Sequence, residues 1–275
     1  MEVTGWDGER GVKWASNAER LEAMLTPVDE ALIEALELKV PSRVADIGCG
    51  GGRTSMAVKS AAPGGSEVVG FDISPALIAL AQERTGESAE GLQFILADAG
   101  TAEAPGRQFD LLVSRFGVMF FEDPPSAFAN LLTWLKPGSR FAFAVWAAPK
   151  DNPWMMAVKN AVSSVAEWPQ PDPDGPGPFR YADGEAFSAL LTDAGFADVA
   201  IKDWRGELPV GGGLPPKDAA TFALTAFSVG EVLDEVDEAS REAAFHHLQN
   251  AYARWASEGV VRAPARVHIV TGHRP

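Results

Sequence analysis

The chain has 275 residues, 46% of them hydrophobic and 22% charged, which is the composition of an ordinary globular protein. Its formal net charge of −15 comes from 38 acidic and 23 dispersed basic residues, so we expect neither nucleic acid nor an anionic membrane as a partner. No apolar run reaches the roughly 18 residues of a membrane helix, and the N-terminus lacks a secretory signal, so we expect a cytoplasmic protein. Cys49 is the only cysteine, which excludes an internal disulfide and a multi-thiolate metal site, and we predict no metal.

Helices and strands alternate between residues 27 and 147. The apolar periodicity predicts helices over residues 26–38, 54–62, 75–84 and 124–135. Short apolar runs predict strands over residues 42–48, 66–74, 92–100 and 139–147, with another inside 109–121. This alternation is typical of right-handed βαβ units, whose strands form a mainly parallel sheet with helices on both faces.

The alternation stops after Trp146. Residues 147–182 contain the stretch WPQPDPDGPGPF, which is too rich in proline for a regular element and is interpreted as an insertion or lid. A helix over 184–195 and a strand over 197–204 resume the pattern. A second irregular passage over 208–218 leads into helices that extend to about residue 257. The stretch ARVHIVTGHR, residues 265–274, predicts a last strand.

These elements predict one α/β domain over residues 1–275, built on a doubly wound, mainly parallel, seven-stranded sheet. In this organisation residues 40–147 form the ligand-binding core, and residues 183–204 and 263–275 complete it. Residues 1–39 supply an N-terminal cover and the first helix. Residues 148–182 and 205–262 are insertions that form a lid.

A glycine-rich loop follows the first strand of this core, in VADIGCGGGRTS, residues 44–55. Glycines at a strand end allow a tight turn and let a ligand approach the backbone closely. Asp72 and Asp98 end the next two strands, where carboxylates can accept hydrogen bonds from ribose hydroxyls and from an adenine amino group. Together the three features predict a site for an adenosine-containing ligand.

The loop spacing distinguishes between adenosine ligands. A dinucleotide loop reads G-x-G-x-x-G, whereas here Gly48 and Gly50 are followed directly by Gly51 and Gly52. Asp46 would repel a pyrophosphate but suits the ammonium group of an amino-acid moiety, directly or through water. The pattern therefore favours S-adenosylmethionine over NAD, and a nucleotide-dependent oxidoreductase is the alternative.

The stretches VADIGCGGGRTS, VVGFDIS, FILADA and FDLLVSRFGVMFFEDPPSAFANLLTWLKPGSRFAF resemble the successive motifs of class I S-adenosylmethionine-dependent methyltransferases. The resemblance is greatest to the ubiquinone/menaquinone-biosynthesis-like group of small-molecule enzymes. It covers residues 40–147 well and 184–204 loosely, and it implies a Rossmann-like methyltransferase fold. The cofactor-binding residues that it implies are Asp46, Gly48, Gly50, Gly52, Asp72, Ile73, Asp98, Ala99, Ser114 and Phe116.

Methyl transfer requires the acceptor, the methyl group and the sulfur to lie in line, with water kept away. Arg115 and His247 are the candidate catalytic residues, although Arg115 could instead pair with Glu122 or Asp123. Cys49 is interpreted as a filler of the loop rather than as a nucleophile.

Trp14, Arg115 and Trp154 are candidate residues for binding the acceptor. Aromatic side chains in the covering segments favour a small apolar or aromatic acceptor. O-methylation is preferred, and C- or N-methylation of a small metabolite is the alternative. A non-catalytic protein that binds S-adenosylmethionine is a further alternative.

Overall fold

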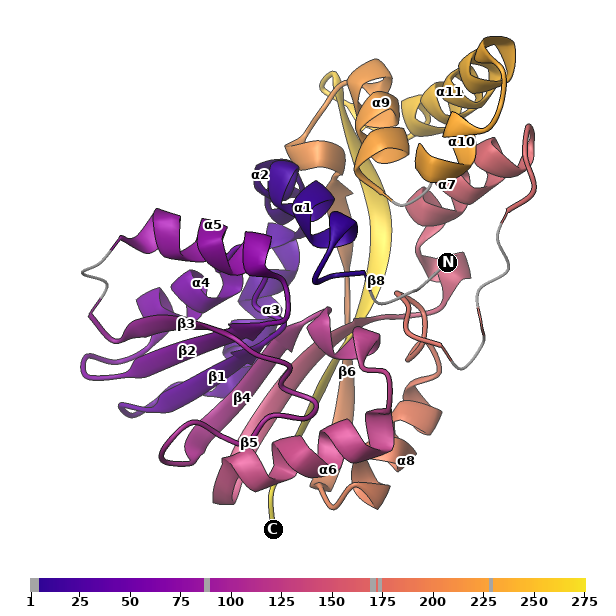
Figure 1. The fold of residues 1–275 in the computed structure, drawn as a ribbon. Helices are drawn as coiled ribbons and strands as arrows, with labels where there is room; N and C mark the ends of the chain where they lie inside the picture. Colours follow the sequence, from indigo (N-terminus) through magenta and orange to yellow (C-terminus); the bar gives the residue numbers. More distant parts are fainter. Residues whose placement is uncertain (1–4, 87–89, 169–171, 173–174, 228–229) are drawn as a thin grey trace.

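The computed structural model describes residues 5–86, 90–168, 172, 175–227 and 230–275. Its sheet has the strand order β3-β2-β1-β4-β5-β8-β6, and the two-residue β7 pairs with β8 beside this path (Figure 1). β1 to β5 are parallel, and β8 is antiparallel to both β5 and β6. The strands are β1 (Arg43–Ile47), β2 (Glu67–Asp72), β3 (Leu92–Leu96), β4 (Phe109–Arg115), β5 (Leu135–Trp146), β6 (Ala197–Pro209), β7 (Ala256–Ser257) and β8 (Val260–His273). The predicted doubly wound, mainly parallel sheet is confirmed.

Helices cover both faces of the sheet. Figure 1 shows α3 (Asp29–Leu36), α4 (Arg53–Ala61) and α5 (Pro75–Thr85) on one face, and α6 (Pro124–Trp134) and α8 (Gly184–Asp193) on the other. The starts of three of these helices are encoded locally, because Ser74, Asp123 and Asp183 each accept hydrogen bonds from backbone N–H groups in the first turn. The strand residues between the two helix layers are largely buried, as expected for parallel strands covered on both faces.

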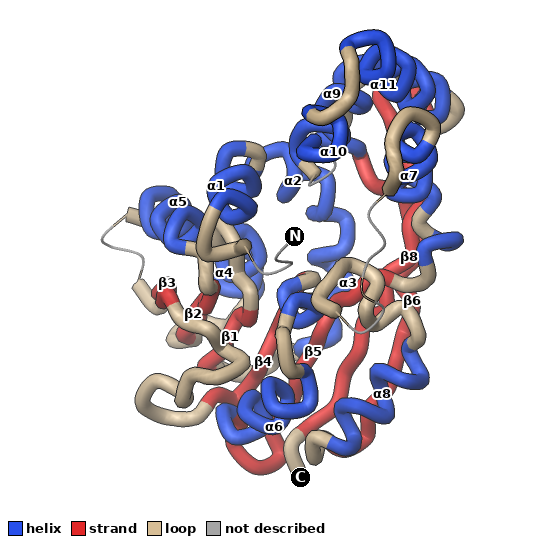
Figure 2. The backbone as a smooth tube through the Cα atoms, turned by 45° about the vertical axis from the view of Figure 1, so that its right-hand side comes forward, coloured by secondary structure: helices blue, strands red, loops and turns tan. Residues whose placement is uncertain are grey.

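A second group of helices lies beyond the carboxyl ends of the parallel strands, at the top of Figures 1 and 2. We call this group the cover. It consists of α1 (Glu9–Ser16), α2 (Ala18–Leu25), α7 (Pro153–Ser163), α9 (Pro216–Ala226), α10 (Gly230–Asp234) and α11 (Glu238–Ala253).

Four elements in or next to the cover differ from the sequence predictions. α1 and α2 precede the expected first helix, and the helix predicted over 26–38 is a 3-10 turn, Thr26–Val28, followed by α3. α7 lies inside the passage that was expected to be irregular. Its buried side chains are Trp154, Ala157, Val158, Ala161 and Val162, which have the spacing of one helix face. The prolines that surround this short pattern concealed it.

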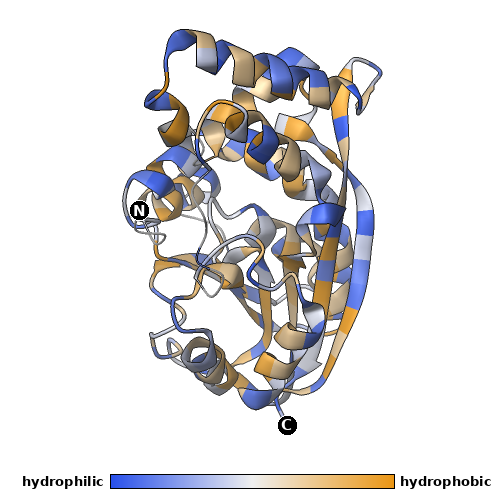
Figure 3. Ribbon diagram, turned by 90° about the vertical axis from the view of Figure 1, so that its right-hand side faces the viewer, coloured by the Kyte–Doolittle hydropathy of each residue, from blue (hydrophilic) through white to orange (hydrophobic). Residues whose placement is uncertain are grey.

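β6 and β8 extend past the carboxyl ends of the parallel strands and support the cover. They stay paired as far as Pro209 and Arg262, so strand structure enters a passage that was expected to belong to the second insertion. Figure 3 shows hydrophobic and hydrophilic residues alternating along these strands. Val261, Ala263 and Ala265 are buried on one side, which is the period-2 pattern of a half-buried strand.

The backbones after β1 and β4 touch at two glycines, and this contact generates a stability prediction. A Cβ atom on Gly117 would lie 2.6 Å from the carbonyl oxygen of Ile47 and 2.8 Å from the Cα atom of Gly48. Gly117→Ala should therefore force the two segments apart and lower the free energy of unfolding by about 1–3 kcal/mol, the usual cost of overpacking. Urea denaturation measures this change. Gly64→Ala is the control, because a Cβ there meets nothing within 4 Å. Equal stability of the two variants would contradict the proposed constraint.

Candidate functional site

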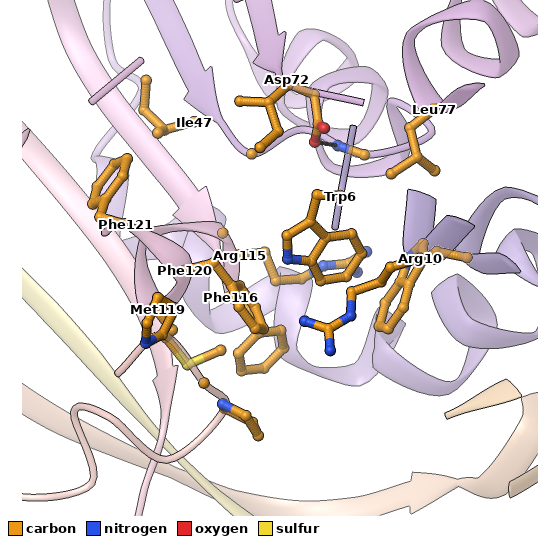
Figure 4. Close-up of a pocket in the computed structure, with 18 of the residues that line it drawn as sticks. Trp6, Arg10, Ile47, Asp72, Leu77, Arg115, Phe116, Met119, Phe120 and Phe121 are labelled. Carbon is orange, nitrogen blue, oxygen red and sulfur yellow. Dashed lines mark hydrogen bonds between the residues drawn. The ribbon is translucent and has the colours of Figure 1, made fainter. Parts of the chain in front are cut away.

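A cavity of about 1250 Å³ lies between the carboxyl ends of the parallel strands and the cover. Part of its wall is shown in Figure 4. Among the side chains and backbone segments that line it, the strand ends and following loops contribute Gly48, Gly50, Asp72, Ile73, Asp98, Ala99, Arg115, Phe116 and Trp146. The cover and its flanking residues contribute Trp6, Trp14, Met24, Trp154 and Phe227. Most of the residues predicted for a cofactor and an acceptor therefore share one cavity.

The glycine loop connects β1 to α4 through backbone conformations that favour glycine. The φ angles of Gly48, Gly50 and Gly52 are 67°, 54° and 83°. A Cβ atom on Gly50 would meet nothing within 4 Å, so its backbone is open on the cavity side. Gly52 has a different role, because a Cβ there would lie 2.6 Å from the Phe94 ring, and Gly52 does not line the cavity.

Asp72, at the end of β2, is held by the glycine loop and by its own turn. Its Oδ2 accepts a hydrogen bond of 2.8 Å from the backbone N–H of Gly50, and its Oδ1 accepts one of 2.9 Å from that of Ser74. Burial raises the pKa of the Asp72 carboxyl, although these bonds act in the opposite direction. Each carboxylate oxygen can accept a second hydrogen bond, so the fixed side chain can still bind two hydroxyl groups.

Ile73, Asp98 and Ala99 lie together on the cavity wall. Asp98 organises its own turn, since its Oδ1 accepts from the backbone N–H of Gly100 at 2.8 Å and its Oδ2 from the Thr101 hydroxyl at 2.9 Å. Ala99 is buried and Ile73 is exposed. These three residues therefore bring apolar surface and a carboxylate to the lining of the cavity.

Besides Gly52, two predicted cofactor residues do not line the cavity, Asp46 and Ser114. Asp46 is fully buried behind the loop, and its Oδ2 accepts a hydrogen bond of 2.6 Å from the Ser55 hydroxyl. Burial raises the pKa of Asp46 to about 7, and no described residue bonds to its Oδ1. The Ser114 hydroxyl donates to the carbonyl of Ile47 at 2.7 Å, which joins β4 to the end of β1. Both side chains support the loop from inside the protein.

Arg115 lines the cavity and forms a buried ion pair with Asp29 of α3. The distance from its Nη1 to Asp29 Oδ1 is 2.8 Å, and the two side chains are 8% and 9% exposed. The expected alternative partners, Glu122 and Asp123, are therefore not the ones that the structure shows. Burial raises the pKa of Asp29, and the adjacent guanidinium opposes that shift.

Four aromatic side chains line another part of the cavity, and we call them the aromatic wall: Phe116, Trp146, Trp154 and Phe227. The rings of Phe116 and Trp146 stack at a centroid distance of 4.3 Å and an angle of 9°. Trp154 lies 5.6 Å from Trp146 and 5.7 Å from Phe227, at larger angles. The wall joins the ends of β4 and β5 to α7 and to the residue after α9.

The N-terminal part of the cover adds a second aromatic group. The Trp6 ring contacts Trp14 edge to face at 5.4 Å and Phe120 at 5.1 Å, and the Arg10 guanidinium lies 5.5 Å from its centroid (Figure 4). Trp14 lines the cavity, which is consistent with its prediction as a site residue.

The candidate catalytic residue His247 lies elsewhere. It is exposed on α11 and lines a separate depression together with Arg254 and Trp255. His268 is buried and bonded through Nδ1 to Asp203 at 2.7 Å. None of the four histidines of the chain lines the cavity that the described residues form.

Sequence reasoning missed one ionic link at the site. Nη1 of Arg84, in α5, donates to both carboxylate oxygens of Glu22 and to the carbonyl of Gly51, each at 2.8 Å. The link attaches α2 to the glycine loop across 62 residues of sequence. Trp146 and Phe227 were also missed, because a buried strand residue and a residue after a helix carry no local signal of a site.

Neither a membrane helix nor a metal cluster is evident in the part of the chain that the structure describes. No helix there combines the length and apolar character needed to cross a bilayer. No group of three or more His, Cys, Asp or Glu side chains among those residues is arranged to hold a metal ion.

Comparisons with known proteins agree with this geometry. The chain is 30% identical over 173 residues to phosphoethanolamine N-methyltransferase 1 of Arabidopsis thaliana, which is 62% of this chain and 32% of that protein. It is 34% identical over 115 residues to demethylmenaquinone methyltransferase of Thermus thermophilus, covering 42% of this chain and 51% of the relative. The chain therefore spans about a third to a half of the length of these curated relatives.

Solved structures share the fold. The YcgJ protein of Bacillus subtilis superimposes with a TM-score of 0.58 at 18% identity, covering 90% of this chain and 98% of that one. Phosphoethanolamine N-methyltransferase 2 of Haemonchus contortus gives a TM-score of 0.52 at 16% identity, covering 90% and 52%. The family model described as "Methyltransferase domain" matches residues 17–201, which is more than half of the chain. The chain therefore belongs to the methyltransferase domain family, that of the class I S-adenosylmethionine-dependent methyltransferases.

Proposed function

We propose that this chain transfers the methyl group of S-adenosylmethionine to an oxygen atom of a small apolar or aromatic acceptor. The observation that carries the proposal is the composition of the cavity. The glycine loop and Asp72 line one part of it, the aromatic wall lines another, and the two share one cavity. Such an arrangement suits two ligands that must meet, one polar and one apolar.

The residues of the cavity fit S-adenosylmethionine. Asp72 would accept hydrogen bonds from the ribose hydroxyls, and the open backbone at Gly50 would lie against the methionine part. Ile73 and Ala99 would contact the adenine, with Asp98 at its edge. Asp46 would act from behind the loop, by supporting it through Ser55.

When bound, this cofactor supplies a methyl carbon attached to a positively charged sulfur, and an acceptor lone pair forms the new bond as the electrons of the carbon–sulfur bond remain on sulfur. The chain's own contribution is positioning and the exclusion of water. The faces of aromatic rings attract a cation, so the aromatic wall is compatible with the charge on sulfur. Residues of the cover line the side of the cavity that faces the strand ends.

The lack of a general base on the aromatic wall favours an acceptor that is already ionised. The aromatic wall contains no titratable side chain, and the Asp29 carboxylate nearby is paired with Arg115. An oxyanion can be methylated to a neutral product without losing a proton, so it needs no general base. O-methylation of an ionised hydroxyl or carboxyl group is therefore the preferred reaction.

N-methylation of a small amine is the second candidate, and the relatives named for phosphoethanolamine support it. A phosphate-bearing acceptor would require cationic side chains directed at it. In the cavity Arg115 is already paired with Asp29, whereas Lys13 donates to the carbonyl of Phe227 at 3.0 Å and Arg10 lies over the Trp6 ring. The pairing of Arg115 and the four rings of the aromatic wall favour the apolar acceptor over the phosphorylated one.

The cofactor assignment predicts the response of the protein to ligands. S-adenosylhomocysteine should raise the melting temperature, because a ligand that binds only the native state stabilises it by mass action. NAD and NADP should leave the melting temperature unchanged. Thermal unfolding monitored by circular dichroism measures all three. A shift with NAD and none with S-adenosylhomocysteine would reverse the assignment in favour of an oxidoreductase.

The role of Asp72 predicts a loss of cofactor affinity. Asp72→Ala should weaken binding of S-adenosylhomocysteine by about 1.5–3 kcal/mol, the range for hydrogen bonds to a charged group. Isothermal titration calorimetry measures this loss. Asp193→Ala is the matched control, because Asp193 is exposed on α8 and lies outside the cavity. If Asp72→Ala binds as tightly as the control, the ribose lies elsewhere.

A further inference from the structure

We propose that Arg84 is a positioning residue for the cofactor. Together with Glu22 of α2 it holds the carbonyl of Gly51, so that the glycine loop binds S-adenosylmethionine tightly when α2 is in place. The inference rests on the proposed function, because it concerns the glycine loop of the same cavity. It adds a residue that lies outside the cavity and a coupling between the cover and the bound cofactor.

Gly51 differs from the other glycines of the loop. The other three have positive φ angles, which glycine favours, whereas Gly51 does not. A side chain is excluded there by contact, because a Cβ atom would lie 2.6 Å from Oε1 of Glu22 and 2.7 Å from Nη1 of Arg84. The absence of a side chain at Gly51 therefore makes room for this ion pair.

The ion pair joins three elements at one point. Nη1 of Arg84, near the end of α5, is 2.8 Å from both carboxylate oxygens of Glu22 and from the carbonyl oxygen of Gly51. Gly51 and Glu22 line the cavity, whereas Arg84 does not. Arg84 would therefore act on a ligand through the two residues that it holds.

The ion pair fixes geometry more than it stabilises the fold. In a largely buried pair the cost of taking both charges out of water offsets most of their attraction, so the net gain in stability is small. The hydrogen bonds nevertheless require one arrangement of the partners, and this arrangement sets Gly51 relative to α2. The adjacent residue, Gly50, donates its N–H to Asp72. The carboxylate proposed to bind the ribose is therefore connected to α2 through two adjacent loop residues.

Cofactor binding and the docking of α2 should be linked thermodynamically. The helix forms part of the cavity, whose lining includes Leu21, Glu22, Met24 and Leu25. If docked α2 raises the affinity for the cofactor, bound cofactor must stabilise docked α2 by the same factor. The coupling can therefore be measured from either side, and neither measurement requires the acceptor.

Isothermal titration calorimetry with S-adenosylhomocysteine tests the role of Arg84 in the full chain. Arg84→Met keeps an unbranched stem but removes the guanidinium, so it should weaken binding about three- to tenfold, within the range of coupling between residues in contact. Gly51→Ala keeps both charges but displaces them, and should weaken binding to a similar extent. Arg140→Met is the control and should leave the affinity unchanged, because Arg140 pairs with Glu37 at 3.1 Å outside the cavity.

A double-mutant cycle separates positioning from direct contact with the cofactor. Glu22→Ala combined with Arg84→Met should bind no more weakly than the weaker of the two single variants, because the two residues act as one unit. Glu22→Gln keeps an oxygen that can accept from Arg84, so it should bind S-adenosylhomocysteine more tightly than Glu22→Ala.

Amide hydrogen exchange measures the coupling from the side of α2. Saturating S-adenosylhomocysteine should slow exchange over residues 18–25 in the wild-type protein and in Arg140→Met, because bound ligand opposes local opening of the helix. The slowing should be smaller in Arg84→Met at equal saturation.

Several results would overturn the inference. Unchanged affinity in Arg84→Met and Gly51→Ala would refute the role of the ion pair and leave the proposed function standing. Additive losses in the cycle would show that Glu22 and Arg84 act separately, and equal slowing of exchange in wild type and Arg84→Met would refute the coupling. If Arg84→Met does not fold, Gly51→Ala decides, because its Cβ meets side-chain ends that can move aside. Failure of the wild-type protein to bind S-adenosylhomocysteine, measured first, would instead remove the proposed function itself.

Discussion

The close contact between the backbones of Gly48 and Gly117 is the constraint on which the site depends. The two residues follow β1 and β4, neighbouring parallel strands, and a Cβ on Gly48 would lie 2.7 Å from the Cα of Gly117. The bond from Ser114 to the Ile47 carbonyl holds the same strand ends together. Because the two loops meet at this point, Gly50 and Phe116 line one cavity although 66 positions separate them in sequence.

The cover is linked by hydrogen bonds to the glycine loop. Arg84 connects Glu22 of α2 with the carbonyl of Gly51, and Lys13 of α1 reaches the carbonyl of Phe227. Glu22 is 8% exposed and Arg84 is 25% exposed, so solvent screens this ion pair less than it screens a surface pair. Displacement of the N-terminal helices would therefore disturb both the glycine loop and the aromatic wall.

The polar and apolar parts of the cavity have different origins. The glycine loop and Asp72 belong to the parallel sheet and form where β1 and β2 end, as ligand sites in such sheets do. The aromatic wall requires β5, α7 and the segment after α9, and the long pair of β6 and β8 carries the last of these to the cavity. Substitutions in the cover can therefore change the aromatic wall and leave the glycine loop and Asp72 unchanged.

The alternation of helices and strands, the glycine loop and the carboxylates at the next strand ends could be predicted from the sequence, because all of them depend on local signals. Alternating apolar runs predicted β1 to β5, and the glycine loop, Asp72 and Asp98 were located by their places at strand ends. Only the tertiary structure decided the rest. The ion pair of Arg115 with Asp29 and the link from Arg84 to Glu22 join residues far apart in sequence. α7 is a short helix among prolines, and its periodicity becomes decisive only when its buried face has a surface to pack against. The aromatic wall combines four residues from separate elements, and no spacing in the chain records which rings will meet.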